Sequence, residues 1–518
     1  MKKNFFMAAA LLVALAGCNK QELQSVAPDT QDGKLYMQFS VNMLSTRSGT
    51  DGDTEYPSDA TPDYEVGKDR ENTISKVDIV LTKDNGASYV VADNVVPSAA
   101  SKTSYVASFN TLELEAGATY EVLVYANCEA PVALNLDEVS SETVANITSD
   151  NNFWMTNAYA PATTTLPADL SLYTQPQNPL NLGSHYVERA MARFDYMPVN
   201  NNVYEIMKDE AVNATITLTE AALINQSKSF YMFRRVSADG TDADWARGGV
   251  ETMANFVVDT DFAAKANGYA EGLAANFDFH LTAPEGWEWK SVAAADLGET
   301  DSWEGTAGGA TGAVGGGNHE LNDYCIWQYA KENTIPDADA QDHGLSTGIV
   351  FKGELAGAAV DAAKGEMIYV FENVLYGNWE AVKTAATADN APATLAAAYN
   401  KVAAIETPAV SDYAAAGFTG YNPDSEGKYY AYYYYWNRHN DNADNAKMGP
   451  MEFAVVRNNV YKLCVDKIAK FGHPDPTDPG NPDPDPVDPD DPNEEINYYF
   501  TVNVKVLPWV VRVNHIEF

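Results

Sequence analysis

Short runs of alternating apolar and polar residues recur along most of this chain, separated by Gly, Pro, Asn and Asp. A period of two, rich in β-branched residues, predicts strands. The clearest runs are Ile74–Leu81, Tyr120–Ala126, Ala214–Leu218 and Gly348–Phe351. One Ala-rich stretch, Pro392–Ala404, predicts a helix in an insertion. We therefore expect an all-β fold with few short helices in insertions.

The pattern near the N-terminus predicts a half-buried strand over residues 35–43. Its buried face is expected to consist of Leu35, Met37, Phe39, Val41 and Met43. Residues 45–53 follow as a polar, glycine-containing stretch in which Arg47 is the one basic residue. Because a protease needs an extended and accessible chain, Arg47 is a candidate cleavage site. The alternative is that Arg47 is simply a solvated side chain.

Pro alternates with Asp in a stretch that opens at Gly472-His473-Pro474 and runs to Asn493. Proline favours the extended polyproline II conformation and the carboxylates repel one another, so this stretch is expected to be a semi-rigid spacer. A calcium-binding loop is the alternative. The prolines argue against it, since they prevent the turn that would gather carboxylates, and the glycine spacing of an EF-hand is absent.

The tail beyond the spacer, residues 496–518, again alternates. Phe500, Val502, Val504 and Val506 share one face, Pro508 ends the strand, and a second apolar segment begins at Trp509. A spacer of this kind is not needed to place a strand in its own sheet, which favours a strand donated to another molecule through main-chain hydrogen bonds. The alternative is a tail that completes its own domain across a surface loop.

The first residues are typical of a bacterial lipoprotein export signal. Lys2 and Lys3 precede an apolar run, Phe5–Ala16, and the chain then reads Leu15-Ala16-Gly17-Cys18. The run is too short to span a bilayer as a helix, and small residues before a cysteine suit a peptidase that cuts at a lipidated Cys. We expect the mature protein to begin at an acylated Cys18. The alternative is an ordinary signal peptide with a chance cysteine.

Composition limits the remaining possibilities. A chain of 518 residues suggests two or three domains, and MPVNNN at residues 197–202 suggests a boundary there. Its 73 acidic and 33 basic residues give a formal charge of −40, which repels nucleic acid and excludes it as a partner. Cys128, Cys325 and Cys464 show no C-x-x-C spacing, so a disulfide framework is not expected. One bridge or buried free thiols both remain open.

Motifs of catalysis are missing from the sequence. The seven histidines form no HExxH motif, no G-x-S-x-G elbow occurs, and the glycine run Gly305–Gly317 lacks the Lys-Ser or Lys-Thr of a phosphate loop. We therefore expect no catalytic residue, no metal and no cofactor. The aromatic run Tyr429–Trp436 has two interpretations: a platform for glycan rings, or a strand with one core face and one interface face.

Taken together, these segments resemble the fimbrillins of Bacteroidales-type (type V) pili, in particular the major shaft subunits and the branch of minor, or short, fimbriae. The resemblance rests on the order of several short motifs along most of the chain. These are the lipobox ending at Cys18, Met43–Arg47, Val187–Arg193, Tyr369–Asn373, Val456–Tyr461, the Pro-rich spacer and Thr501–Trp509. The spacer departs from the family pattern in its length and Asp-Pro content.

The resemblance implies two transthyretin-like β-sandwich domains in tandem. Mapped onto this chain, the parts are a signal peptide (1–17), a propeptide with the first strand (18–47), an N-terminal domain (48–198), a C-terminal domain (199–472), the spacer (473–495) and C-terminal donor strands (496–518).

The resemblance also implies an assembly route. A precursor lipidated at Cys18 reaches the outer membrane, and an arginine-specific protease cuts between Arg47 and Ser48. The first strand then leaves, and the donor strand of the next copy fills the groove. The cut subunit joins anchor and tip subunits in a cell-surface fimbria that supports adhesion. By position, the donor residues are Phe500, Val502, Val504, Val506 and Trp509.

A monomeric surface lipoprotein that binds a glycan or host ligand is the competing interpretation, together with a tip or accessory adhesin. A glycan-binding lipoprotein would need neither an excisable strand nor a tethered terminal strand. A tip adhesin would lack one of the two. Both are expected here, which favours a shaft subunit.

Overall fold

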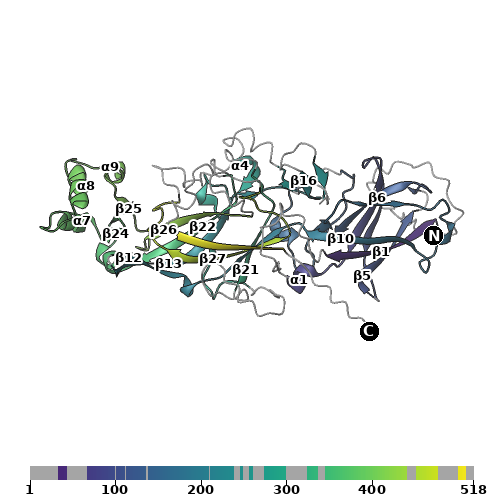
Figure 1. Ribbon diagram of the computed structural model, residues 1–518, viewed down its shortest axis with the longest axis horizontal. Helices are drawn as coiled ribbons and strands as arrows, with labels where there is room; N and C mark the ends of the chain where they lie inside the picture. The colour runs from purple at the N-terminus through teal and green to yellow at the C-terminus, as the bar shows by residue number, and fades with distance from the viewer. Residues whose placement is uncertain are drawn as a thin grey trace, which may run out of the picture. The chain divides into compact units, whose positions relative to one another are not determined.

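The computed structural model describes thirteen segments of the chain. These are residues 33–43, 67–99, 101–110, 113–135, 138–208, 210–237, 245–248, 256–260, 273–298, 324–335, 345–439, 451–476 and 500–508. Strands dominate and the helices are short (Figure 1), so the prediction of an all-β sandwich fold is confirmed. No helix in these segments is long and apolar enough to cross a membrane.

The chain divides into two compact units, each built from separate stretches of sequence. Unit 1 takes in the chain up to Val41, Lys76–Glu138 and Pro161–His185. Unit 2 takes in Asn42–Ser75, Val139–Ala160 and Tyr186–Phe518. The predicted domain boundary at residues 198 and 199 stays a prediction.

Unit 1 is a curled sheet of mainly antiparallel strands. One run of neighbours is β3-β2-β6, with β9 on β6, and another is β10-β1-β5-β4. The elements that lie wholly or partly in this unit are β1 (Lys34–Met43), β2 (Val77–Lys83), β3 (Ser88–Val95), β4 (Pro97–Ser98), β5 (Ser101–Asn110), β6 (Thr119–Ala126), β9 (Ala162–Thr165), η2 (Ser171–Tyr173) and β10 (Leu180–Arg189).

The hairpin of β2 and β3 shows how local sequence sets the fold of unit 1. Asp84, Asn85 and Gly86 all adopt positive φ, which these residue types tolerate better than others. Apolar residues of β2 then pack on both faces, because Val77, Ile79–Leu81 and their neighbours are buried. The predicted strand at residues 74–81 is thus confirmed, three residues shorter at its start.

Unit 2 contains two larger sheets and several small ones. The larger sheets have the orders β21-β11-β27-β28 and β12-β13-β22-β26, with β20 on β13. The elements outside the insertion between β22 and β26 are α1 (Asp69–Asn72), β7 (Val139–Ser140), α2 (Val144–Ile147), β8 (Met155–Asn157), β11 (Ala192–Tyr196), η3 (Asn200–Asn202), β12 (Val203–Lys208), β13 (Ala211–Ile224), β14 (Gln226–Ser227), β15 (Phe230–Tyr231), β16 (Arg235–Ser237), β17 (Ala246–Arg247), β18 (Phe256–Val258), α4 (Leu273–Asn276), β19 (Phe277–Asp278), η5 (Pro284–Gly286), β20 (Lys290–Ser291), β21 (Cys325–Ala330), β22 (Gly348–Ala356), β26 (Tyr430–Trp436), β27 (Asn459–Ile468) and β28 (Phe500–Pro508).

The main core of unit 2 lies between the two larger sheets. Phe194 on β11 and Leu463 on β27 belong to the same buried cluster as Ile216 on β13 and Phe351 on β22. Alternation explains this arrangement, since β22 sends Ile349 and Phe351 to the core and its even-numbered residues to the other face. Both sheets therefore bury one face, as a sandwich requires.

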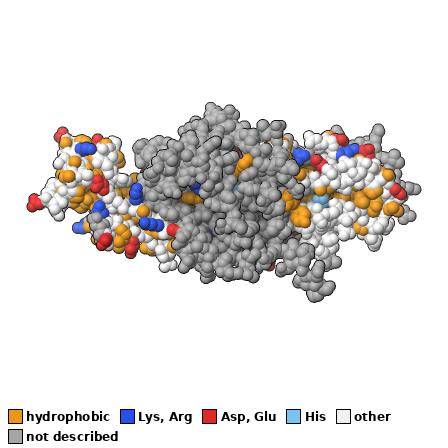
Figure 2. Space-filling model, viewed as in Figure 1, with side chains coloured by type: hydrophobic (Ala, Val, Ile, Leu, Met, Phe, Trp, Pro, Cys, Tyr) orange, Lys and Arg blue, Asp and Glu red, His pale blue; other side chains and the backbone are white. Residues whose placement is uncertain are grey.

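A compact insertion joins the adjacent strands β22 and β26. Its elements are α6 (Ala358–Ala363), β23 (Ile368–Phe371), β24 (Val374–Tyr376), α7 (Trp379–Ala386), α8 (Ala393–Ala403), α9 (Val410–Ala415) and β25 (Thr419–Tyr421). The predicted helix at residues 392–404 is confirmed as α8. The insertion has its own core, in which Leu395 and Val402 pack with Val382 and Phe418. Figure 2 shows hydrophobic side chains at the surface where Figure 1 draws α7, α8 and α9.

The main core generates a stability prediction. Phe351→Ala is expected to lower the free energy of unfolding of unit 2 by about 3 to 5 kcal/mol, because it leaves a cavity among buried neighbours. All nine tryptophans lie in unit 2, so urea unfolding followed by tryptophan fluorescence reports this unit alone. Met207→Ala is the control, since Met207 is 47% exposed on β12 and its loss should cost less than about 1 kcal/mol. Equal losses would contradict this placement of the core.

Candidate functional site

Strand β1 occupies an internal position in unit 1. It pairs antiparallel with β5, with Lys34 opposite Asn110 and Ser40 opposite Ser104, and β10 is its neighbour on the other edge. Both backbone edges of β1 are therefore covered by other strands. A strand in this position cannot be removed without leaving two rows of unpaired amides and carbonyls.

The apolar face of β1 is buried along its whole length. The exposed fraction is at most 6% for each of the five predicted residues, Leu35, Met37, Phe39, Val41 and Met43. The other face carries Tyr36, Gln38, Ser40 and Asn42, which are half-buried or exposed. The predicted strand and its buried face are therefore present, while its excision stays a prediction.

Phe39 of β1 contacts two other aromatic rings. Its ring stacks on Tyr105 of β5, with centroids 5.4 Å apart and planes 12° from parallel. His185 of β10 meets the same ring edge-on at 6.4 Å. Burial of His185 lowers its pKa, so the imidazole is held neutral beside the phenyl ring. On the opposite face of β1, the Ser40 hydroxyl donates to Ser184 at 2.8 Å.

Several predicted site residues lie outside the described segments. These are Cys18, Arg47, Ser48 and Trp509. Most of the spacer and the first four residues of the tail, from residue 477 to 499, also lie outside them. The lipidation and cleavage sites therefore stay predictions from sequence.

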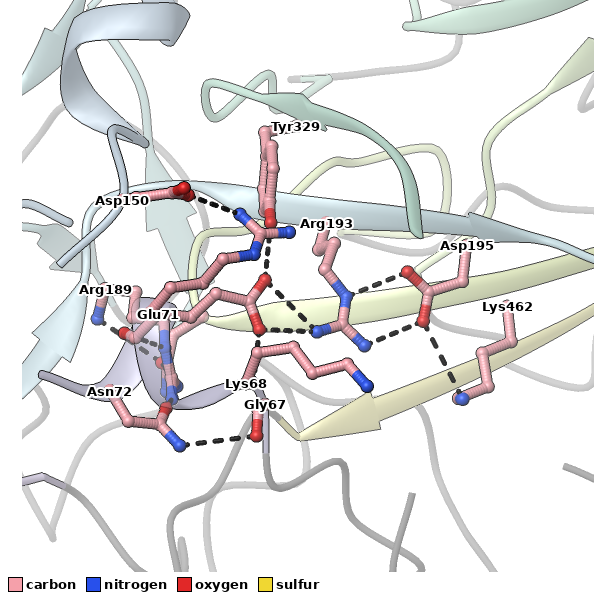
Figure 3. Close-up of polar contacts among 12 residues, drawn as sticks. Gly67, Lys68, Glu71, Asn72, Asp150, Arg189, Arg193, Asp195, Tyr329 and Lys462 are labelled. Atoms are coloured by element: carbon pink, nitrogen blue, oxygen red, sulfur yellow. Dashed lines mark hydrogen bonds and ion pairs between the residues drawn. The ribbon is translucent and has the colours of Figure 1, made fainter. Parts of the chain in front are cut away.

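Unit 2 contains a buried ionic network that the sequence reasoning missed (Figure 3). Arg193 on β11 binds the carboxylate of Asp195 through two hydrogen bonds of 2.8 Å. The same guanidinium donates to Glu71 of α1 at 2.9 Å. Lys462 on β27 lies directly opposite Asp195, with its ammonium 3.7 Å from the carboxylate. Glu71, Arg193, Asp195 and Lys462 are all completely buried.

Alternation along β11 explains where the network lies. Phe194 faces the main core, so Arg193 and Asp195 must face the other side of the same sheet. Helix α1 covers that side, and its Glu71 accepts from the Tyr329 hydroxyl of β21 at 2.5 Å as well as from Arg193. The signal in the sequence was a pair of charges inside an otherwise apolar strand, which is costly unless the charges are paired.

Arg189 ties the same helix to the end of β10 within unit 2. Its guanidinium donates to the carbonyl of Glu71 at 3.3 Å and to the side chain of Asn72. It also donates to Asn458 Oδ1 at 3.3 Å. The chain that follows the predicted cleavage loop is thus held at α1 by two buried arginines.

The protonation state of Glu71 follows from these contacts. Burial alone would raise its pKa, but Arg193, the backbone N–H of Lys68 and the Tyr329 hydroxyl hold the pKa of Glu71 below its ordinary value. Glu71 is therefore an anion in the folded protein at neutral pH, and it balances part of the buried positive charge.

Strand β28 lies beside β27 in unit 2. It pairs antiparallel over its length, with Phe500 opposite Ile468 and Pro508 opposite Asn459. In the order β21-β11-β27-β28 it is the last strand among the described residues. The predicted strand in the tail is present, and Pro508 closes it as expected. Donation of this strand to a groove in another copy stays a prediction.

The start of the spacer is fixed against β26. Tyr432 and His473 exchange two backbone hydrogen bonds of 2.8 Å, and the Tyr434 hydroxyl donates to the Pro476 carbonyl at 2.8 Å. Gly472 permits this approach, because a Cβ there would lie 2.3 Å from the Tyr432 carbonyl oxygen. The spacer therefore leaves unit 2 from a defined point.

The aromatic run has one core face and one outer face. Tyr433 and Tyr435 belong to the main core, while Tyr430, Tyr432 and Tyr434 are half-buried on the other side. Trp287 lies edge-on to Tyr434, and Trp289 packs at 5.9 Å from Tyr432. This outer face is thus largely occupied by the chain itself, which favours the strand interpretation over an open platform. None of Cys128, Cys325 and Cys464 forms a disulfide with another described residue.

The network generates a prediction for the acid stability of unit 2. Glu71→Gln is expected to cost roughly 3 kcal/mol at pH 7, because it leaves Arg193 without one buried counter-charge. Since the pKa of Glu71 is lowered on folding, this stabilisation is present above the unfolded value of 4.5 and is lost as pH falls below it. Urea unfolding at pH 7, 5 and 3.5, followed by tryptophan fluorescence, measures the difference between variant and wild type.

The control is Glu380→Gln, which removes an exposed partner of Lys383 and should change stability by less than about 0.5 kcal/mol. A cost for Glu71→Gln that stays constant down to pH 3.5 would contradict the assigned role of its charge.

One family model matches the chain. It describes the C-terminal region of fimbrillin, the major fimbrial subunit protein type IV, and it matches residues 427–515. This range contains β26, β27 and β28, the spacer, and the tail up to residue 515. No curated protein matches the sequence.

Several solved structures are similar over nearly the whole chain. A proposed cell adhesion protein from Parabacteroides distasonis is 14% identical with a TM-score of 0.39, over 93% of this chain and 99% of that one. A fimbrilin from Porphyromonas gingivalis is 14% identical with a TM-score of 0.37, over 92% and 98%. A proposed cell adhesion protein from Bacteroides eggerthii is 10% identical with a TM-score of 0.34, over 92% and 97%. Over residues 427–515, this chain is similar to the C-terminal region of the fimbrillins, which are fimbrial subunits.

Proposed function

We propose that this chain is a shaft subunit of a cell-surface fimbria that polymerises by strand exchange. It is exported as a lipoprotein attached through Cys18 and is cut between Arg47 and Ser48. Strand β1 then leaves, and the C-terminal strand of another copy takes its place. The family supports a fimbrial structural subunit and a surface location, and the finer steps are our proposal.

The observation that carries the proposal is the position of β1. It is an internal strand of unit 1 whose apolar residues are all buried, yet it belongs to a short N-terminal segment that one cut at Arg47 would separate. Burial of its five apolar side chains contributes on the order of 10 kcal/mol before ordering costs. A replacement strand that makes the same contacts would recover this energy. The cut makes the exchange irreversible.

The placement of β28 supports the role of donor. As the last described strand of its sheet it has one strand neighbour, β27, so its release breaks one ladder of hydrogen bonds. Insertion between β5 and β10 of another copy would form two ladders. These two ladders replace the two that β1 takes with it, so the cost of the exchange in main-chain hydrogen bonds is the single ladder between β27 and β28.

The network around Glu71 supports the proposal because it binds α1, which follows the proposed cut in the sequence. The chain after Arg47 reaches α1, where Glu71 and Asn72 are held by Arg189 and Arg193. A cut in the loop would therefore release the segment that contains β1 while α1 stays bound to β11. The fimbrillins are fimbrial subunits, and the similarity to them agrees with the expectation that this chain is not an enzyme.

The first prediction of this proposal concerns the cut. Arg47→Ala is expected to leave a lipidated, monomeric precursor on the membrane, because β1 remains covalently attached and its groove stays filled. Mass and N-terminal sequence of the surface-exposed protein, run beside an unheated denaturing gel, measure this: wild type should begin at Ser48 within a ladder, and the variant at Cys18. Arg70→Ala is the matched control, with normal processing expected. A normal ladder from Arg47→Ala would remove the cleavage step.

The second prediction concerns the tail. A chain that ends at Asn493 is expected to fold and to be cut but to form no polymer, since it retains the groove and lacks the donor strand. Electron microscopy and the unheated gel measure filament length and ladder formation. Mixed with wild type, this truncated chain should cap filaments and shorten them. Filaments of unchanged number and length from the truncated chain alone would mean that the tail acts only within its own subunit.

A further inference from the structure

The tail contains a segment whose pattern of apolar and polar residues matches that of β1. Without a gap, residues 495–504 align with residues 34–43, so that Phe, Val and Asn recur in the same order. A hydroxyl residue stands between Phe and Val in both. The paired positions are Leu35 with Ile496, Met37 with Tyr498, Phe39 with Phe500, Ser40 with Thr501, Val41 with Val502, Asn42 with Asn503 and Met43 with Val504.

We propose that residues 495–504 of a second copy replace β1 in the same direction and in the same register, with Phe500 in the place of Phe39. This inference rests on the strand exchange proposed above and specifies how the partner is recognised. The alignment places Ile496, Tyr498, Phe500, Val502 and Val504 on the face that β1 buries. It also places Tyr499 and Thr501 on the face that β1 leaves half-exposed.

The surroundings of Phe39 select this register. Its ring lies flat on Tyr105 and meets the edge of His185, and both neighbours are buried. A shift of two residues would bring either Tyr498 or Val502 to this place. The shift that brings Tyr498 here would also put Glu494 in the fully buried place of Leu35. The shift that brings Val502 here would leave a void, so both are unfavourable. A shift of one residue would turn the apolar face outward.

The neighbours of Ser40 and Val41 select the direction. In the proposed alignment Thr501 takes the place of Ser40 and keeps a hydroxyl within reach of Ser184. A strand inserted in the opposite direction, with Phe500 still beside Tyr105, would put Tyr499 in the place of Ser40. It would also put the larger Tyr498 in the fully buried place of Val41.

The register is tested by disulfide cross-linking between full-length copies. Ser40 lies directly opposite Ser104, and opposite residues of antiparallel strands are close enough for a disulfide. The chain with Thr501→Cys and Ser104→Cys should therefore give polymers that resist boiling in denaturant until they are reduced. The two single variants give the background from the native cysteines.

Two further pairs test the alternatives. Asn503→Cys with Ser104→Cys reports a strand shifted by two residues. Thr501→Cys with Val106→Cys reports a reversed strand, because Gln38 lies opposite Val106. Neither pair should link above background. Linking through either pair instead of the first would overturn the proposed register.

A second measurement separates this inference from the proposal on which it rests. Phe500→Ala is expected to lower the yield of polymer by at least about 10-fold, since truncation of a buried aromatic residue is among the costliest changes. Tyr499→Ala, at the adjacent exposed position, should retain polymer within about 2-fold of wild type. Equal yields would overturn the place given to Phe500. If polymer depends on the tail but the first pair does not link, the register fails and strand exchange stands. If polymer forms without the tail, strand exchange itself fails.

Discussion

The backbone of an internal strand must be paired on both sides, and β1 is the strand on which this requirement falls in unit 1. With β5 on one edge and β10 on the other, β1 supplies hydrogen bonds to two neighbours and a full apolar face to the core. A fold built around such a strand cannot leave its place empty in water. In the proposed function, the cut at Arg47 empties this position and the tail of another copy fills it.

The buried ionic network in unit 2 holds α1 in place, whereas β1 is the strand that is proposed to leave. Charges are expensive in an interior, and removal of one partner usually costs more than the pair contributes. Glu71, Arg193 and Asp195 therefore act as an all-or-none anchor for α1. The segment between β1 and α1 thus joins a strand held by apolar burial to a helix held by ionic contacts. The proposed cut between them would give one fragment that contains β1 and one that contains α1.

The local sequence pattern predicts individual strands and helices, but it does not predict which residues far apart in the chain contact one another. Alternation identified the buried face of β1, and Ala content located α8 to within one residue at each end. By contrast, nothing near Glu71 in the sequence indicates that its partner is Arg193, because β11 lies far along the chain. The same limit applies to Val139–Ala160, which returns to unit 2 between two stretches of unit 1. The tail illustrates both points. Its alternating pattern predicts the strand β28, but no pattern in the sequence indicates that β27 is the neighbouring strand.

The contact between His473 and Tyr432 gives the tail a fixed origin. Because Pro476 is also held at β26, residues 477–494 join this point to the proposed donor segment, residues 495–504. If this connection were fully extended at about 3.1 Å per residue, it would reach about 56 Å. The number of residues in this connection therefore limits the distance between two subunits that the proposed exchange can join. Each Asp-Pro pair added or deleted in the sequence would change that limit.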